Sequence, residues 1–316
     1  MNMETKDSVI AQLEEERSSI VEDSLELALD ARKAKYIDGS EIEIALDLPD
    51  DLEIQNVILD HDGTISTLRE GWEIVMHEVM MEFICGSKLT ELSTNEYHRI
   101  SKKCEKFIDD TTGIQTIVQM QGLREIVIEE GFILETEVKS AAEYKAIYLD
   151  RLMVSVDDRI NRFEKGERQI CDFTIQGAPE LLDALHEKGL TLFLASGTDE
   201  DNVVIEANSL GYGDAFNGGI RGSKGNEIGD AKKIVIDRII EEGNCVGNNL
   251  MVIGDGPVEI IEGRRVGALC IGVASDEIRR HGINYSKRTR LIKAGAHIII
   301  PDFSQLPILI KTIFGK

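Results

Sequence analysis

The sequence predicts an α/β protein in which a helical domain is inserted into a parallel sheet just after the first strand. Three observations carry this prediction. Residues 57–59 form a short apolar run of the kind found in a buried strand, which ends at Asp60. From residue 173 onward, similar runs alternate with amphipathic segments, as in a parallel sheet covered by helices. Between them, residues 68–172 show the 3.6-residue apolar spacing of helices and few strand signals.

Residues 1–50 precede the first strand and are predicted to form an acidic helix followed by a linker. Residues 8–35 carry apolar side chains near helical spacing. Residues 1–55 hold 16 acidic and 5 basic groups, whereas residues 276–316 hold 8 basic and 3 acidic groups. We expect the helix to dock on that basic region or on a second copy of the chain, and a mobile acidic tail is the alternative. The docking contacts are expected from Leu13, Ile20 and Leu25.

The inserted segment contains four stretches with helical periodicity, and one interruption that offers polar groups. The periodic stretches are 69–84, 94–110, 116–130 and 137–165. Just before the third stretch, a Thr-Thr-Gly sequence that ends at Gly113 interrupts helical periodicity, and polar groups lie there at Thr112, Gln115 and Thr116. We expect this loop to face a substrate, with ordinary packing or solvation as the alternative.

Beyond the insert, the apolar runs are predicted to be strands and the amphipathic segments helices. The predicted strands are 191–198, 249–256, 268–275 and 297–303, and the predicted helices are 199–211 and 230–244. Because crossover connections make such strands parallel, their carboxyl ends meet at one edge of the sheet. Side chains that follow these strands are therefore candidates for a shared site.

Composition excludes several classes of protein. The net charge of −23 argues against a nucleic-acid or anionic-membrane surface. No apolar run approaches the roughly 18 residues of a membrane span, and the start of the sequence lacks the pattern of a signal peptide. The five cysteines are odd in number and without CxxC spacing, so we expect reduced thiols rather than a disulfide framework or zinc site. A cytoplasmic protein is expected.

Reactive groups follow three of the predicted strands. They are Asp60 and Asp62, then Ser196, Gly197 and Thr198, and then Asp255, with Lys232 opening a helix in between. One carboxylate can attack phosphorus while a second transfers protons to and from oxygen. A hydroxyl and backbone N–H groups hold phosphate oxygens, and a lysine and carboxylate-bound Mg²⁺ neutralise the phosphoryl charge. The set fits phosphoryl chemistry.

These residues carry a resemblance to a known superfamily. The motifs "DHDGT", "LASGT", "AKKIVIDRII" and "IGDGPVE" occur in this order. The chain resembles the haloacid dehalogenase superfamily, in its phosphatase branch with a helical cap, which includes phosphoglycolate phosphatase. The resemblance runs from about residue 54 to the C-terminus. It implies a Rossmann-like three-layer core, residues 51–67 and 173–316, and a helical cap, residues 68–172.

The resemblance also implies a role for each motif residue. Asp60 would be the nucleophile and Asp62 the general acid/base, which favours a phosphatase over a dehalogenase. Mg²⁺ would lie between the Asp60 carboxylate, the Asp62 backbone carbonyl and Asp255. The phosphate would be bound by Ser196, the N–H groups of Gly197 and Thr198, and Lys232.

Three lysines compete for the third motif, and the helical pattern favours Lys232. Apolar residues at +3, +4, +7 and +8 from Lys232 form one buried face, which places Lys232 toward the core edge. Lys233 turns about 100° away from that face. Lys224 lies in a Gly/Ser-rich loop and fits least well.

Two residues depart from the superfamily pattern. His61 stands where many relatives carry an apolar or aromatic side chain, and it is either a substrate contact or a structural histidine. Glu259 replaces the commoner second aspartate of the fourth motif. Being longer by one methylene, it would reach the metal through water or orient Asp255, or have no metal role.

Three functions fit the sequence. The first is a Mg²⁺-dependent phosphatase of a small phosphorylated metabolite, such as a sugar phosphate or a phosphoglycolate-like compound. A sugar-phosphate mutase or other phosphotransferase would use the same aspartyl phosphate. A non-catalytic binding protein is the third alternative, although it predicts decayed motifs and every core role is filled here.

Overall fold

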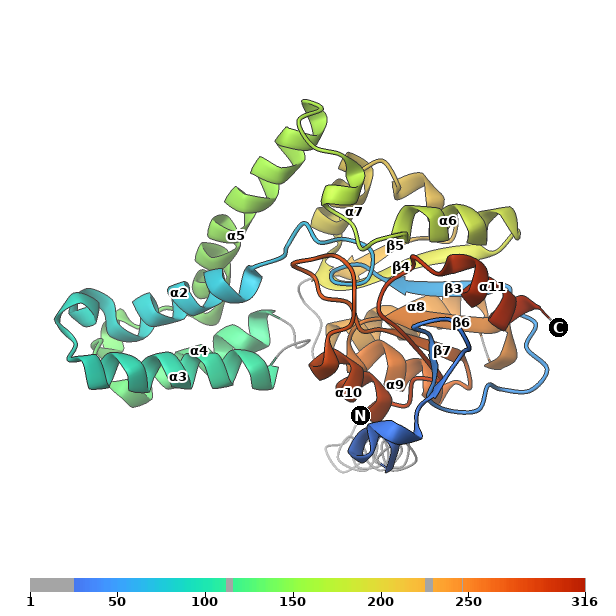
Figure 1. Ribbon diagram of the computed structural model, residues 1–316. Helices are drawn as coiled ribbons and strands as arrows, with labels where there is room; N and C mark the ends of the chain where they lie inside the picture. The colour runs from blue at the N-terminus through green and yellow to red at the C-terminus, as the bar shows by residue number, and fades with distance from the viewer. Residues whose placement is uncertain (1–25, 112–115, 225–229, 246, 316) are drawn as a thin grey trace, which may run out of the picture. The chain divides into compact units, whose positions relative to one another are not determined.

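The computed structural model describes residues 26–111, 116–224, 230–245 and 247–315. The chain divides into two compact units (Figure 1). One unit is the helical segment Arg69–Lys165, and the other contains the described residues on both sides of it. The chain leaves the sheet unit after Leu68 and returns to it at Gly166.

The larger unit is built on one sheet of eight strands in the order β1-β2-β8-β7-β6-β3-β4-β5. The strands are β1 (Lys35–Tyr36), β2 (Glu43–Ile44), β3 (Asn56–Asp60), β4 (Thr191–Asp199), β5 (Gly219–Ser223), β6 (Leu250–Gly254), β7 (Leu269–Val273) and β8 (Ile298–Ile300). Strands β3 to β8 are parallel, and β1 and β2 add an antiparallel edge beside β8. The predicted α/β class with a mainly parallel sheet is confirmed.

Strand β3 occupies the centre of the sheet and pairs in parallel with β4 and β6. Its apolar residues are completely buried, as expected for a strand covered on both faces. Leu59 is level with Ile253 of β6, and Asp60 is level with Ala195 of β4. This register brings the ends of the three strands together beside Asp60.

Helices cover both faces of this sheet (Figure 1). They are α6 (Ala178–Glu187), α7 (Glu200–Ser209), α8 (Ala231–Gly243), α9 (Pro257–Arg265), α10 (Tyr285–Lys293) and α11 (Leu306–Phe314). Helices α8, α9 and α10 lie on one face, and α6, α7 and α11 lie on the other. On the first face, Ile236, Ile260 and Leu291 join alternate strand residues in one buried apolar cluster. Its burial is the main stabilising contribution to this layer.

The helical unit contains α2 (Trp72–Cys85), α3 (Thr94–Thr111), α4 (Thr116–Glu130) and α5 (Ala141–Glu164). Helix α2 packs against the other three helices. Helix α5 begins with a capping box, in which Ser140 and Glu143 satisfy each other's backbone N–H groups. Its buried side chains recur every four residues, which is the stripe of a packed amphipathic helix. They are Tyr144, Tyr148, Leu152 and Val156.

The structure differs from the prediction for residues 8–35. Residues 1–25, with the docking contacts expected from Leu13, Ile20 and Leu25, lie outside the described residues. Of the described remainder, only residues 26–29 are α-helical, because a 3₁₀ turn at Ala31–Lys33 and strand β1 follow. A helix through residue 35 is therefore wrong. Strands β1 and β2 have two residues each, which is too short to give a periodic signal, so the sequence predicts only a linker there.

The β1–β2 segment is anchored to the C-terminal part of the chain by a buried ion pair. Arg288 of α10 donates to both carboxylate oxygens of Glu43, with N–O distances of 2.5 to 3.0 Å. Both side chains are buried, with Glu43 completely so. The pair fastens β2 to α10. Docking of the N-terminal segment on a second copy of the chain, which would form a homodimer, remains a prediction.

In the part of the chain that the structure describes, no helix combines the length and apolar character needed to span a membrane.

Candidate active site

Asp60 is the last residue of β3, and its carboxylate is fixed from two sides. Lys232 Nζ, at the start of α8, lies 2.7 Å from Asp60 Oδ1. The hydroxyl of Thr64 donates to Asp60 Oδ2 at 3.1 Å. The side chain is almost wholly buried, so the two contacts act in a low dielectric. Lys232, rather than Lys233, is the lysine beside Asp60, because Lys233 pairs with Asp237 and Glu262.

The environment shifts the pKa values of this pair. Burial raises the pKa of Asp60 well above its ordinary value, with Lys232 acting in the opposite direction. For Lys232, burial alone would lower the pKa, but Asp60 and Glu259 raise it above the ordinary lysine value. Lys232 is thus a fixed cation. A further cation next to Asp60 would favour its ionised form.

Two more carboxylates lie close to Asp60. Ligand atoms of Asp60, Asp255 and Glu259 are within 4.8 Å of one another. Glu259 Oε2 is 2.9 Å from Lys232 Nζ, while its other oxygen accepts the Gly256 N–H at 2.7 Å. The structure therefore brings together the predicted first, third and fourth motifs.

A second lysine, which the sequence did not single out, reaches this cluster. Lys287 Nζ of α10 lies 2.5 Å from Asp255 Oδ2 and 2.6 Å from Glu277 Oε1. Burial would raise the pKa of Asp255, but Lys287 and then Lys232 hold it below the ordinary value. Asp255 is thus kept as a carboxylate.

The charge and the donor set of the cluster fit a divalent metal ion. Four carboxylates face two ammonium groups, which leaves an excess of two negative charges when all are ionised. Carboxylate oxygens are the ligands that hard cations such as Mg²⁺ prefer. The groups counted are Asp60, Asp255, Glu259, Glu277, Lys232 and Lys287.

Two glycines let the backbone approach these carboxylates. Gly63 has φ of +78°, and a Cβ there would lie 2.4 Å from Asp255 Oδ2. A Cβ on Gly254 would lie 2.3 Å from the Glu259 side chain. Both contacts are closer than carbon or oxygen atoms tolerate, so the cradle around the acidic cluster requires glycine at both positions.

The second motif lies at the end of β4. Ser196 is buried, and its Oγ accepts the Thr198 N–H at 3.1 Å. This contact uses the Thr198 N–H predicted to bind phosphate, but it leaves the Ser196 hydroxyl proton free to be donated. The Thr198 hydroxyl donates to Asp62 Oδ2 at 3.1 Å. Gly197 is exposed, and a Cβ there would lie 3.8 Å from Lys232 Cβ.

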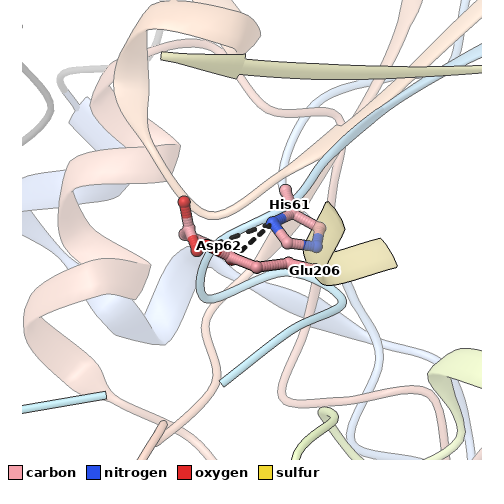
Figure 2. Close-up of side chains that lie close together, drawn as sticks. All are labelled: His61, Asp62 and Glu206. Carbon is pink, nitrogen blue, oxygen red and sulfur yellow. Dashed lines mark ion pairs between the residues drawn. The ribbon is translucent and has the colours of Figure 1, made fainter. Parts of the chain in front are cut away.

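His61 and Asp62 form a second cluster with Glu206 of α7 (Figure 2). His61 Nδ1 is 3.6 Å from Asp62 Oδ1 and 4.0 Å from Glu206 Oε2. The His61 ring is completely buried, and its Nε2 lies 2.8 Å from the Tyr212 hydroxyl. A direct substrate contact of His61 remains a prediction.

The predicted substrate loop gives no site in the described residues. Gly113 and Gln115 lie outside them, and Thr116 is the first residue of α4 in the helical unit. Their role in facing a substrate remains a prediction.

Sequence reasoning missed the partners that come from distant segments. Thr64 follows the first motif, and its hydroxyl could have been noted there. Lys287 and Glu277 carry no motif, and Glu206 and Tyr212 lie in and after a helix with no catalytic pattern. Only the tertiary arrangement brings these four to the site.

Comparisons with known proteins agree with this architecture. A family model described as haloacid dehalogenase-like hydrolase matches residues 54–267. No curated protein matches the sequence.

Solved structures share the fold at low sequence identity. A β-phosphoglucomutase from Clostridium difficile has a TM-score of 0.56 at 16% identity, covering 83% of this chain and 97% of its own. A predicted phosphoglycolate phosphatase from Haemophilus somnus 129pt has a TM-score of 0.53 at 15% identity, covering 81% and 97%. A predicted phosphatase from Clostridium acetobutylicum has a TM-score of 0.50 at 16% identity, covering 82% and 99%. The family match, which spans more than half of the sequence, confirms the resemblance drawn from the four motifs: the chain belongs to the haloacid dehalogenase-like hydrolases.

Proposed function

We propose that this chain is a Mg²⁺-dependent phosphatase that hydrolyses a small phosphate monoester through an aspartyl phosphate on Asp60. A sugar phosphate or a phosphoglycolate-like compound is the expected class of substrate. The observation that carries the proposal is the buried Asp60 carboxylate, fixed by Thr64 and Lys232 within a cluster that has two excess negative charges when all its groups are ionised. A fixed nucleophile and a site for a divalent cation are the two requirements of this chemistry.

The Mg²⁺ ion would be held by Asp60, Asp255 and the backbone carbonyl of Asp62. Bound there, it would neutralise charge on the phosphoryl group. Lys287 keeps Asp255 ionised. Glu259 is positioned by Lys232 and the Gly256 N–H, so it would support the metal site without binding the ion directly.

The chain's own residues account for both chemical steps. In the first, an Asp60 oxygen bonds to phosphorus, the ester P–O bond breaks, and Asp62 gives its proton to the leaving oxygen. In the second, Asp62 takes a proton from the water that attacks the aspartyl phosphate, which releases phosphate and restores Asp60. Ser196 donates its hydroxyl proton to a phosphoryl oxygen, and Lys232 holds the transferring group by charge.

The test is phosphate release across a panel of phosphorylated metabolites with Mg²⁺. Asp60→Asn is expected to abolish turnover because an amide is a poor nucleophile. Asp183→Asn, at an exposed position of α6, is the matched control and should leave turnover unchanged. EDTA should stop the reaction, and added Mg²⁺ should restore it.

The outcomes of this test separate the alternatives. Full activity in Asp60→Asn would refute the assignment of the nucleophile. Turnover that needs an acceptor sugar and releases no phosphate would make the protein a phosphotransferase. Complete inactivity of the wild-type chain over a broad panel would favour a binding protein. From the net charge of −23, we also infer that nucleic acids and anionic membranes are not partners. From the scattered cysteines without CxxC spacing, we infer a cytoplasmic location.

A further inference from the structure

His61 lies in the sequence between Asp60 and Asp62, two residues of the proposed active site. It is buried beside Asp62, the general acid/base of the proposed reaction. Its side chain is 0% exposed. One ring nitrogen, Nδ1, faces the carboxylates of Asp62 and Glu206, at 3.6 and 4.0 Å (Figure 2). The other, Nε2, lies 2.8 Å from the Tyr212 hydroxyl. The ring therefore bridges a phenol and two carboxylates.

The hydrogen-bond partners determine where the ring carries its proton. Burial raises the pKa of Tyr212 far above its ordinary value, so the phenol keeps its proton. Ser66, whose Oγ accepts the Leu68 N–H at 3.1 Å, acts on the Tyr212 pKa in the opposite direction, but burial has the larger effect. In one of the two possible orders, Tyr212 donates its proton to Nε2 of His61.

That order leaves the proton of a neutral His61 on Nδ1, facing the two carboxylates. The opposite tautomer would turn a nitrogen lone pair toward two negative groups, which is repulsive in a buried site. Among the described residues, His61 Nδ1 has no hydrogen-bond partner. At 3.6 Å its contact with Asp62 is electrostatic rather than a hydrogen bond.

Asp62 therefore has a hydrogen bond at one oxygen and an electrostatic contact at the other. Thr198 donates to Oδ2 at 3.1 Å, and the N–H of His61 faces Oδ1. A general acid must keep its proton within reach of the leaving oxygen, and small displacements are costly in rate. We propose that His61 is a positioning residue, which with Tyr212 and Glu206 holds Asp62 in place to protonate the leaving alkoxide. This inference rests on the proposed function.

The dependence of the rate on the leaving group tests this role. An alkoxide leaves only when it is protonated, whereas a nitrophenolate needs little protonation. The rates to compare are kcat/KM for the best alkyl phosphate of the metabolite panel and for p-nitrophenyl phosphate. The value of kcat/KM depends only on the steps up to departure of the leaving group. Hydrolysis of the aspartyl phosphate, which is the same for both substrates, therefore does not affect the comparison.

Four substitutions at or near His61 give the informative set. His61→Leu removes both nitrogens and should lower kcat/KM for the alkyl ester roughly tenfold more than for the aryl ester, as a part of the 10²–10⁴ that acid–base transfer provides. His61→Asn keeps an N–H donor near the position of Nδ1 and should recover most of that loss. Tyr212→Phe keeps the aromatic ring and removes the partner of His61 Nε2. It should lower kcat/KM less than His61→Leu does, and again more for the alkyl ester than for the aryl ester. Asp62→Asn removes the general acid itself, so it should give the largest difference between the alkyl and the aryl ester.

The outcomes distinguish this role from the proposed function itself. If Asp62→Asn is selective and His61→Leu slows both esters equally, His61 is merely structural and the inference is overturned, while the phosphatase assignment stands. Full activity of His61→Leu on both esters would also overturn it. Inactivity of the wild-type protein on both would refute the function and this role together. If His61→Leu does not fold, the Asn and Phe variants carry the same comparison.

Discussion

Replacing Arg288 with methionine is expected to destabilise the protein by about 3–5 kcal/mol, because it leaves the Glu43 carboxylate buried without its cation. Glu43 is 0% and Arg288 5% exposed, so water cannot replace the lost partner without opening the fold. The guanidinium donates through two of its nitrogens to both carboxylate oxygens. The loss therefore removes charge-assisted hydrogen bonds as well as a Coulomb attraction.

The double variant separates the cost of an orphaned charge from the value of the pair. Glu43→Met combined with Arg288→Met leaves no charge in the site, and buried pairs replaced by apolar residues are often neutral in stability. We expect the double variant to lie within about 1–2 kcal/mol of the wild type. As a matched control, Arg162→Met breaks an exposed pair with Asp158 on α5 and should cost no more than about 1 kcal/mol.

Equilibrium unfolding in urea measures these differences as free energies, with the slope checked for two-state behaviour. Two results would refute the reasoning. One is a cost below about 1 kcal/mol for Arg288→Met, which would mean that water reaches Glu43. The other is a double variant as unstable as the single one, which would attribute the loss to packing around Arg288 and not to charge.

Three further predictions follow from the site. Asp255→Ala should weaken Mg²⁺ binding in calorimetry, whereas Lys232→Ala should largely retain it and lose turnover; equal affinity of Asp255→Ala and the wild type would mean that the metal lies elsewhere. Gly63→Ala should abolish Mg²⁺-dependent activity and lower the melting temperature, because its Cβ would meet Asp255 Oδ2 at 2.4 Å; Gly39→Ala, also at positive φ but with nothing within 4 Å, should cost only the backbone strain of about 1–2 kcal/mol. Because the pKa of Asp60 is raised in the folded protein, its stability contribution is present below the unfolded pKa and lost as pH rises through the folded value. In EDTA, Asp60→Asn should therefore melt higher than the wild type near neutral pH, with the gap closing in acid; a gap that widens in acid would contradict this assignment.

The core of the site was predictable because its residues end strands that sequence alone reveals. Asp60 and Asp255 follow apolar runs, and Lys232 begins a helix whose buried face is periodic. Parallel strands bring their carboxyl ends together at one edge of the sheet. The local sequence pattern of these residues is therefore enough to predict that they lie in the same site.

Other parts depend on tertiary contacts that leave no local trace. Lys287 meets Asp255 only because α10 packs against β7, next to β6. Strand β5, with the sequence GIRGS, contains two glycines and little β-forming character, so it was not predicted. It forms because it pairs with β4 at the edge of the sheet.

The central position of β3 has a consequence for the order in which the chain folds. Asn56 pairs with Thr191 and Leu250, which are 135 and 194 positions later in the sequence. Closing loops of this length costs entropy before any strand contact repays it, and contacts so distant slow folding. The helical unit Arg69–Lys165 lies within both connections, and if it folds first it shortens the flexible chain to be closed. During synthesis, β3 and Asp62 just after it emerge long before either partner strand. Asp60, the nucleophile of the proposed reaction, therefore stays in an unpaired strand until most of the protein has been made.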